Sequence, residues 1–574
     1  MMKNKIGKLN RTVPLRKMLF GTVFGWIACI SFCGCDDFLS GEPEIAYTAE
    51  TLFNDTLKLS MASLGVYEPL SYVETYGRDL LPADCGEDLV CVTNLYGTES
   101  GSTPGLVGCY SIQVNSGVVY GAWMHFYKGI NSANTVINNG QDLLNSPNIK
   151  IRNAAKKYVA EARTLRAFYY MDLVRRFGDI PIRTISTDIS NHNSKISSRE
   201  EVYQLIFRDL EEAALDLPWH DEDESMSGRV TKGTALGLLV RAYMYAGGYS
   251  LQRDGVMKRP ENYQDYYRKA EIYSRELITS GKHALNPNYE DIFKKLCQNI
   301  PEPKESMFVI DFSYPEGDKA HYGCIGARTI GVEIKGHSDV YNISPELRTH
   351  YFAYQKFKNG DLRRGYSIAD YTLEGTKFEK KPIEVKQSSK WGVAKWRRDW
   401  HDPAPIEKNY SEVNFPMLRY AEVLLMRAEL LNELYGPTEE AIELVNQVRR
   451  RGYGVDIHTY SPAVDVPRKY RQSKEDFFNF LTEEYAREFL GEHGRKFHLI
   501  RWNLLKQKLD EVGNFFDNPD NKPFHGLGCV DAGGYLSRRS FVPGMHELWP
   551  IPYKEIINSD GNMTQTNPGY PAGI

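Results

Sequence analysis

The chain has 574 residues, of which 42% are hydrophobic and 25% charged, as in an ordinary globular protein. Its formal net charge is only −4, which gives no basic footprint for nucleic acid, and we exclude that class of function. Aromatic residues are numerous, with 37 Tyr, 25 Phe and 8 Trp, and this fits either a packed core or a polar binding surface.

The first 34 residues have the features of a secretory signal peptide. A start rich in lysine and arginine precedes an almost wholly apolar run over residues 18–32, which is shorter than the roughly 20 residues of a membrane-spanning helix. Cys35 follows Gly34 just after this run, in a pattern that resembles the lipobox of bacterial lipoproteins. We therefore predict that residues 1–34 are removed, that Cys35 carries lipid and that residues 35–49 form a tether. The alternative is an ordinary cleaved signal peptide without lipid.

The cysteines do not indicate a disulfide-built fold or a metal site. Outside the signal peptide and Cys35, six remain, at positions 85, 91, 109, 297, 324 and 529. Cys85 and Cys91 are close enough in sequence to close a small loop, but free or partly paired cysteines are the favoured interpretation. There is no CxxC pair, no zinc-like Cys/His spacing and no twelve-residue calcium loop, so we predict no metal and no cofactor. Calcium in an acidic loop of another kind is left open.

Apolar residues at three- and four-residue spacing predict a mainly α-helical domain over residues 50–574. Capping residues, glycines and prolines set the ends of the helices. In chain order, the predicted helices cover residues 50–70, 118–140, 158–177, 200–217, 231–247, 263–278, 416–436, 439–451, 474–490 and 495–506.

Three segments lack this period and are rich in glycine, aromatic and polar residues. They lie near residues 71–113, 281–414 and 515–544. We expect irregular loops with some short strands there, inserted into the helical domain. Binding residues are often found in such loops, so these segments are where we expect the ligand site.

Three of the predicted helices share a local pattern, an arginine–alanine pair beside the apolar stripe. The pairs are Arg166-Ala167, Arg241-Ala242 and Arg427-Ala428. Small residues in stacked helix pairs are typical of tetratricopeptide-type arrays, so we predict a tetratricopeptide-like helix-pair scaffold with irregular and small β insertions. The arginines are predicted to be structural and to donate to backbone or carboxylate groups across helix pairs. The alternative is three unrelated amphipathic helices.

Six blocks of sequence resemble the successive signature blocks of the SusD/RagB family of nutrient-binding outer-membrane lipoproteins. They are EARTLRAFYYMDLVRRFGDIP, KGTALGLLVRAYMYAG, PMLRYAEVLLMRAELLNE, AIELVNQVRRR, EEYAREFLGEHGRKFHLIRW and LWPIPYKEIINSDGNMTQTNPGY. The resemblance runs from Cys35 to Tyr570. It implies a lipid-anchored, non-catalytic protein at the cell surface that binds glycans. It also implies a partner, a SusC-like TonB-dependent β-barrel transporter, to which the protein would deliver oligosaccharide.

Sugar binding needs flat aromatic faces together with side chains that form hydrogen bonds with hydroxyl groups. The irregular segments offer nine candidates, which are Tyr72, Tyr76, Arg78, Asp84, Tyr96, Tyr322, Trp391, Trp396 and Trp400. Each aromatic residue among them could instead belong to the core.

Three other functions are left open. A peptide-binding relative of the same family is one, and a structural helical-repeat adaptor is another. A glycoside hydrolase is the third, because 74 acidic residues make carboxylate pairs unavoidable. However, the sequence contains no Gly-x-Ser-x-Gly, His-Glu-x-x-His or phosphate-loop motif.

Overall fold

The computed structural model describes residues 56–92, 103–187, 195–312, 329–336, 343–401, 411–492, 494–524, 530–531, 534–564 and 566–571. Contacts divide the chain into two units, Met1–Leu52 and Phe53–Ile574, and the described residues all belong to the second. The predicted signal peptide, Cys35 and the tether lie outside the described residues.

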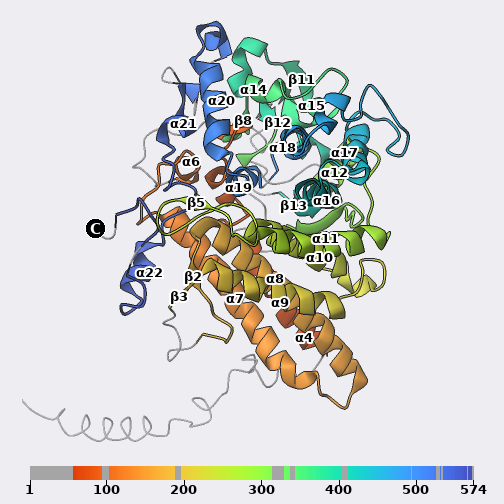
Figure 1. Ribbon diagram of the computed structural model, residues 1–574, viewed down its shortest axis with the longest axis vertical. Coiled ribbons are helices and arrows are strands. Elements are labelled where there is room, and N and C mark those ends of the chain that lie inside the picture. Colours follow the sequence, from red (N-terminus) through yellow and green to blue (C-terminus); the bar gives the residue numbers. More distant parts are fainter. Residues whose placement is uncertain are drawn as a thin grey trace, which may run out of the picture. The chain divides into compact units, whose positions relative to one another are not determined.

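An array of consecutive antiparallel helix pairs forms the scaffold. Each helix packs on the next one along the array, and α7 to α11 lie side by side (Figure 1). The array continues from α11 directly to α16, so the segment between these two helices is an insertion into the array. The predicted tetratricopeptide-like fold class is thereby confirmed. The helices of the array are α7 (Gly117–Leu143), α8 (Ile149–Phe177), α9 (Arg199–Asp216), α10 (Lys232–Ala246), α11 (Tyr263–Thr279), α16 (Tyr420–Tyr435) and α17 (Glu439–Gly452).

Helix α8 is enclosed over much of its length, because α4, α7 and α9 all pack against it. From Tyr158 to Phe177 every residue except Arg163 is buried. Its ends follow local rules: the Asn148 side chain accepts from the backbone N–H of Lys150 at 3.0 Å, and Gly178 ends the helix with φ 71°.

The remaining helices flank the array or lie in the insertions. α18 packs on α16 and α17, while α12, α14 and α15 belong to the segment predicted as loops and strands. Their bounds are α4 (Thr56–Leu64), α5 (Leu80–Ala83), α6 (Pro104–Gly108), α12 (Tyr289–Cys297), α14 (Tyr351–Tyr354), α15 (Arg363–Ser367), α18 (Lys474–Phe489), α19 (Arg495–Arg501), α20 (Leu505–Asp517), α21 (Leu536–Ser540) and α22 (Tyr553–Ile557).

The strands are short and form small separate sheets. β1 (Val90–Val92) pairs with β8 (Leu347–Thr349), and β6 (Ser306–Ile310) pairs with β13 (Phe415–Arg419), both antiparallel. β10 (Tyr371–Glu374) is the middle strand of three, antiparallel to β11 (Glu379–Pro382) and parallel to β7 (Ile334–Lys335). Four further antiparallel pairs are β2 (Ile180–Pro181) with β3 (Ile196–Ser197), β4 (Ser250–Leu251) with β5 (Met257–Lys258), β9 (Ile368–Ala369) with β12 (Gly392–Val393), and β14 (Val530–Asp531) with β15 (Gly534–Tyr535).

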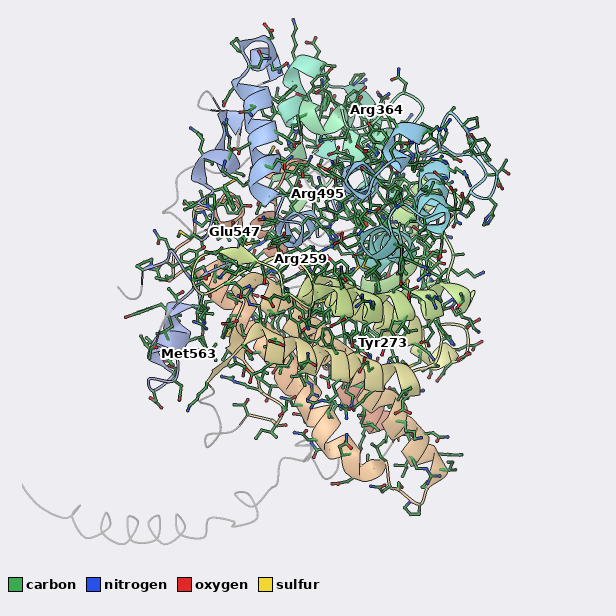
Figure 2. All side chains as sticks on the ribbon, viewed as in Figure 1. Arg259, Tyr273, Arg364, Arg495, Glu547 and Met563 are labelled. Atoms are coloured by element: carbon green, nitrogen blue, oxygen red, sulfur yellow. The ribbon has the colours of Figure 1, made fainter. Side chains whose placement is uncertain are left out.

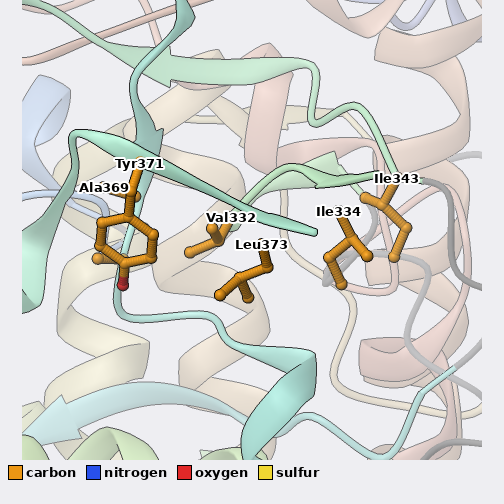
Figure 3. Close-up of a cluster of buried hydrophobic side chains, with 7 residues drawn as sticks. Val332, Ile334, Ile343, Ala369, Tyr371 and Leu373 are labelled. Atoms are coloured by element: carbon orange, nitrogen blue, oxygen red, sulfur yellow. The ribbon is translucent and has the colours of Figure 1, made fainter. Parts of the chain in front are cut away.

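The insertion between α11 and α16 has hydrophobic clusters of its own. One of them is built around the three-stranded sheet and comprises Val332, Ile334, Ile343, Ala369, Tyr371, Leu373 and Ala394 (Figure 3). This local core gives the insertion a defined structure, so it can hold side chains in place beside the array.

Four predicted helices differ clearly from the observed ones. Within the described residues, the helix predicted over residues 50–70 is α4, which ends at Leu64, and the helix predicted over residues 158–177 begins earlier, at Ile149. The helix predicted over residues 416–436 begins only at Tyr420, because residues 415–419 extend into β13 and pair with β6. The helix predicted over residues 495–506 is broken in two, since Asn503 adopts φ 57° between α19 and α20. The pairing of β13 depends on a distant strand, and the left-handed backbone at Asn503 interrupts a helix locally. The spacing of apolar residues predicts neither of them.

Candidate functional site

Two of the segments predicted to carry the site, residues 71–113 and 281–414, are joined by one short pair of antiparallel strands. In the pairing of β1 with β8, Cys91 lies opposite Arg348. The Thr349 hydroxyl adds a further bond by donating to the backbone oxygen of Leu89 at 3.0 Å. Segments 71–113 and 281–414 therefore meet at this ladder, although α7 to α11 separate them in the chain.

Buried charges hold this ladder against the rest of the domain. Arg495, on α19 and labelled in Figure 2, donates to both carboxylate oxygens of Asp88 at 2.8 Å. Burial alone would raise the pKa of Asp88, but the Arg495 guanidinium outweighs it and lowers that pKa. On the other strand, Arg348 donates to the backbone oxygen of Lys390 at 2.7 Å. The junction between the two segments is therefore a fixed part of the structure.

A group of polar side chains surrounds one half-buried tyrosine of the first segment, Tyr72. Tyr72 follows the short helix η1 (Glu68–Ser71) and makes an edge-to-face contact with His125 of α7, with 4.6 Å between ring centroids. The Lys128 ammonium donates to the Tyr72 hydroxyl at 2.5 Å and lies 4.7 Å from the centre of its ring. A carboxylate oxygen of Glu74 lies 3.5 Å from His125 Nε2, and one of Glu68 lies 3.9 Å from Lys128 Nζ. We call Glu68, Tyr72, Glu74, His125 and Lys128 the Tyr72 surface group.

The electrostatics of the Tyr72 surface group suit a neutral polar ligand. Burial is the main cause that lowers the pKa of His125 below its ordinary value of 6.5, so its imidazole is neutral at pH 7 and can donate or accept. Burial also raises the pKa of the Tyr72 hydroxyl, which stays protonated. Together with the Lys128 ammonium and the two carboxylates, the group offers donors and acceptors around one aromatic ring.

Arg78 lies within electrostatic reach of both segments and keeps 39% of its side chain exposed. Its guanidinium donates to Asp79 at 2.5 Å. Burial alone would lower the pKa of Arg78, but the carboxylates of Asp79, Glu346 and Glu74 outweigh it and raise that pKa. Glu346 directly precedes β8 and Glu74 belongs to the Tyr72 surface group, so carboxylates from both segments act on the charge of Arg78.

Tyr76 and Asp84, two of the predicted ligand contacts, are buried. The Tyr76 hydroxyl donates to Asp172 and accepts from Arg175 at 3.0 Å, while Asp84 accepts from Arg176 at 2.5 Å. These partners all lie on α8, where buried charges require compensation. The placement corrects the expectation that these two residues face a ligand.

The three tryptophans of the second segment are dispersed. Trp391 and Trp396 are each only 1% exposed. Trp391 packs in a core cluster with Leu89, whereas Trp396 stacks on Phe415 with 4.6 Å between ring centroids. Their burial leaves no face for a sugar and corrects their assignment as an aromatic platform. Trp400 is half-buried and stays a candidate.

Two further candidates, Tyr96 and Tyr322, lie outside the described residues. Conversely, His125 and Lys128 were not predicted as site residues, because they lie on a helix assigned to the scaffold. Their three-residue spacing on its polar side is a signal that could have identified them. Within the described part of the chain, no cluster of three or more His, Cys, Asp or Glu could hold a metal ion. The cysteines at positions 85, 91, 109 and 297 are buried and form no disulfide among the described residues.

Comparison with known proteins places this fold in a family. The model of the SusD family matches residues 349–570, and a second model, described as "Starch-binding associating with outer membrane", matches residues 37–244. The chain belongs to the SusD/RagB family. The family description thus includes an association with the outer membrane, and none of the helices in the described part of the chain is long and apolar enough to cross a membrane.

Curated relatives and solved structures agree with this assignment. SusD-like protein P2 of Formosa agariphila is 25% identical, with 95% of this chain and 98% of the relative covered. A SusD homolog from Bacteroides thetaiotaomicron has a TM-score of 0.80 at 26% identity, with 91% of this chain and 98% of that structure covered. A laminarin-binding SusD-like protein has the same fold, with a TM-score of 0.66 at 20% identity and with 90% and 99% covered.

Proposed function

We propose that this protein binds oligosaccharides at the cell surface and passes them to a TonB-dependent outer-membrane transporter. The observation that carries the proposal is the Tyr72 surface group, which includes residues of one irregular segment and of α7, in a member of the SusD/RagB family. Proteins of the same fold support the ligand class, since one is a laminarin-binding SusD-like protein and another is a surface glycan-binding protein in complex with laminarihexaose.

The chemistry of the group matches a sugar. The partly exposed Tyr72 ring can stack on the C–H face of a pyranose, as aromatic rings do with flat apolar surfaces. Around it, Lys128 can donate to sugar hydroxyls and Glu74 can accept from them, while neutral His125 can do either. Arg78 adds a donor on the side of the second segment. Hydrogen bonds to charged groups are stronger than neutral ones, so they fix the orientation of the sugar.

The proposal includes an anchor and a partner. Lipid on Cys35 would hold the protein on the outer membrane, exposed at the cell surface, and a SusC-like β-barrel would receive the glycan. We propose a binding protein and not an enzyme, because the Tyr72 surface group offers a platform for hydroxyl groups and its two carboxylates are engaged with His125 and Lys128.

Affinity electrophoresis of the mature protein against starch, laminarin, fructan, mucin and plant glycans tests the ligand class. We expect retardation by at least one polysaccharide and, by calorimetry, binding of its oligosaccharides. Peptide binding with no retardation on the whole panel would contradict the proposal, and so would turnover of a retained glycan.

A further inference from the structure

A second site lies in a cavity of about 330 Å³ that none of the Tyr72 surface group lines. It is enclosed by the connection between α9 and α10 on one side and by the chain from α12 to β6 on the other. The volume is at the lower end of the range of about 300–1,000 Å³ that is usual for small-molecule sites.

The walls of the cavity are mixed in character. Ile292, Leu296, Met307 and Phe308 are buried and give it apolar surface. Polar residues come from both sides: Glu224 and Ser227 belong to the connection between α9 and α10, while Glu302, Ser306 and Asp311 lie where β6 begins and ends. An apolar wall facing a few polar groups is the usual construction of a site for a small organic ligand.

Three polar groups of the lining have unused bonding capacity among the described residues. Ser306 is 6% exposed, and its hydroxyl has no hydrogen-bond partner. The Asp311 carboxylate has no hydrogen bond or ion pair with a described residue, and a Cβ on Gly228 would lie 3.3 Å from its Oδ2. Glu302 accepts from the backbone N–H of Glu305 at 3.0 Å through Oε2, and its Oε1 has no such partner in the described chain. A buried hydroxyl without a partner is unfavourable, and a ligand can supply the missing bond.

The cations near the cavity are already compensated. Lys295 forms an ion pair with Asp291 at 2.8 Å, and Arg229 forms one with Glu161 at 2.9 Å. What the cavity offers to a ligand is therefore mainly hydrogen-bond acceptors, namely the carboxylates of Glu302, Asp311 and Glu224 together with the Ser306 hydroxyl. A fitting ligand has to bring hydrogen-bond donors. Hydroxyl groups on a small apolar ring satisfy this requirement without adding a buried charge.

We propose that this cavity binds a single neutral sugar unit. Its hydroxyls donate to Asp311 and Glu302 and share a hydrogen bond with Ser306, while its C–H face lies against Leu296 and Ile292. The choice of a sugar among hydroxyl-bearing ligands rests on the proposed function. The protein would then have two sites, an open surface for a chain of sugars and an enclosed one for a single unit.

Ligand-observed NMR and calorimetry on the mature protein test the proposal with glucose, galactose, mannose and N-acetylglucosamine at millimolar concentration. We expect at least one of them to bind, and Asp311→Asn and Ser306→Ala each to weaken that binding about tenfold. Asp370→Asn is the matched control, because Asp370 is exposed and does not line the cavity. Melting temperatures of all variants establish that they are folded.

The outcomes separate the cavity from the surface group. If Tyr72→Ala abolishes polysaccharide retardation while monosaccharide binding stays sensitive to Asp311→Asn, the two-site proposal holds. If no polysaccharide is retarded but monosaccharide binding still depends on Asp311, the proposed function fails and the cavity site stands. Absence of monosaccharide binding in the wild type, or equal binding by wild type and Asp311→Asn, overturns the cavity site.

Discussion

Glu488, on α18, accepts hydrogen bonds from arginines of three separate parts of the chain. Its carboxylate accepts from Arg451 at 2.5 Å, Arg419 at 3.0 Å and Arg363 at 3.1 Å, and all four side chains are buried. These arginines come from α17, β13 and α15, so one carboxylate ties the array to the insertion. A buried carboxylate with this many partners is costly to remove, because its cations would be left without compensation.

Replacing Glu488 with Gln is expected to lower the free energy of unfolding by about 3–5 kcal/mol, measured by denaturant titration at pH 7. Glu379→Gln is the control, since the Glu379 side chain is 62% exposed and pairs only with the exposed Lys381 among the described residues. That change should stay within about 1 kcal/mol. Equal effects of the two substitutions would contradict a structural role for the Glu488 network.

The same residue predicts a pH dependence. Burial alone would raise the pKa of Glu488, but Arg451, Arg419 and Arg363 outweigh it and lower that pKa to about 2. A pKa lowered in the folded state means that the stabilisation is complete above the unfolded value of about 4.3 and is lost as pH falls towards 2. The difference in unfolding free energy between wild type and Glu488→Gln should therefore be the same at pH 7 and pH 6 and smaller at pH 3. A difference that grows on acidification would reverse the assigned sign.

At the surface, Tyr72→Ala tests the proposed ligand contact. Removing the ring should weaken binding of a retained oligosaccharide about tenfold, which corresponds to about 1.4 kcal/mol, because the stacking face is lost. Calorimetry measures the change. Tyr435→Ala is the matched control, since Tyr435 lies at the end of α16 and is 61% exposed. If Tyr72→Ala binds as the wild type does, the Tyr72 surface group is not the site.

Between elements, the three arginines of the repeated arginine–alanine pattern act as cross-links, and their predicted structural role is confirmed. Arg166 of α8 donates to Asp209 of α9 at 2.7 and 2.8 Å and to Asn134 of α7 at 2.8 Å. Arg241 of α10 donates to Glu422 of α16 at 2.6 and 3.0 Å. The third, Arg427 of α16, reaches Glu271 of α11 and Glu440 of α17, and the members of the pattern therefore bind neighbouring helices together.

Removing Arg241 and removing Arg427 would leave their carboxylate partners with different degrees of charge compensation. Without Arg241, Glu422 keeps among the described residues only His498, at 3.9 Å. Burial, followed by nearby arginines, lowers the pKa of His498 far below 6.5, so it is neutral and does not compensate the carboxylate. Without Arg427, Glu271 still has Arg275, and Glu440 is half-exposed to water.

We therefore expect Arg241→Met to lower the free energy of unfolding by about 3–5 kcal/mol and Arg427→Met by about 1–3 kcal/mol. Thermal and denaturant unfolding measure both changes, and Arg268→Met, at an exposed pair on α11, serves as the control. A larger effect of Arg427→Met than of Arg241→Met would contradict this account of compensation.

Helices α7 and α8 approach each other closely at a glycine. A Cβ added to Gly129 would lie 2.2 Å from the Tyr169 ring, whereas one added to Gly117, at the start of α7, meets nothing within 4 Å. Helix propensity favours alanine over glycine by up to about 1 kcal/mol, so overpacking must outweigh this gain at Gly129.

For that reason Gly129→Ala should lower the free energy of unfolding by about 1–3 kcal/mol, while Gly117→Ala should be neutral or slightly stabilising. The comparison uses the same substitution on the same helix. Circular dichroism melts of the two variants suffice, and a stable Gly129→Ala protein would show that the interface can relax around the added methyl group.

For the whole molecule, the proposed lipid on Cys35 would decide where the proposed binding surface is held. Cys35→Ser should remove incorporation of labelled fatty acid and move the protein from the membrane to the soluble fraction, since several acyl chains are needed for a stable anchor. Cys33→Ser is the matched control and should leave both properties unchanged. Loss of labelling in Cys33→Ser but not in Cys35→Ser would move the lipid to the other cysteine.

Much of the scaffold could be predicted from sequence, because helical periodicity is a local property. Apolar residues every three or four positions indicated the helices that became α7 to α11, α16, α17 and α18. The segment around Tyr76 was assigned to loops for its composition, yet residues 75–92 are buried apart from Arg78. The composition of this segment correctly predicts that it lacks helical periodicity. It carries no information on which distant elements cover the segment and bury it.

The sequence by itself determined the array of helices, its recurring arginines and the family, since each depends on residues a few positions apart. Only the tertiary structure decided which aromatic side chains are available to a ligand. Tyr72 lies half-buried beside α7, while Trp391 and Trp396 are covered by segments far away in the chain. The pairing of β1 with β8 and the cavity beside β6 have the same origin. Burial and pairing are set by contacts between remote segments, and such contacts leave no periodic signal in the sequence.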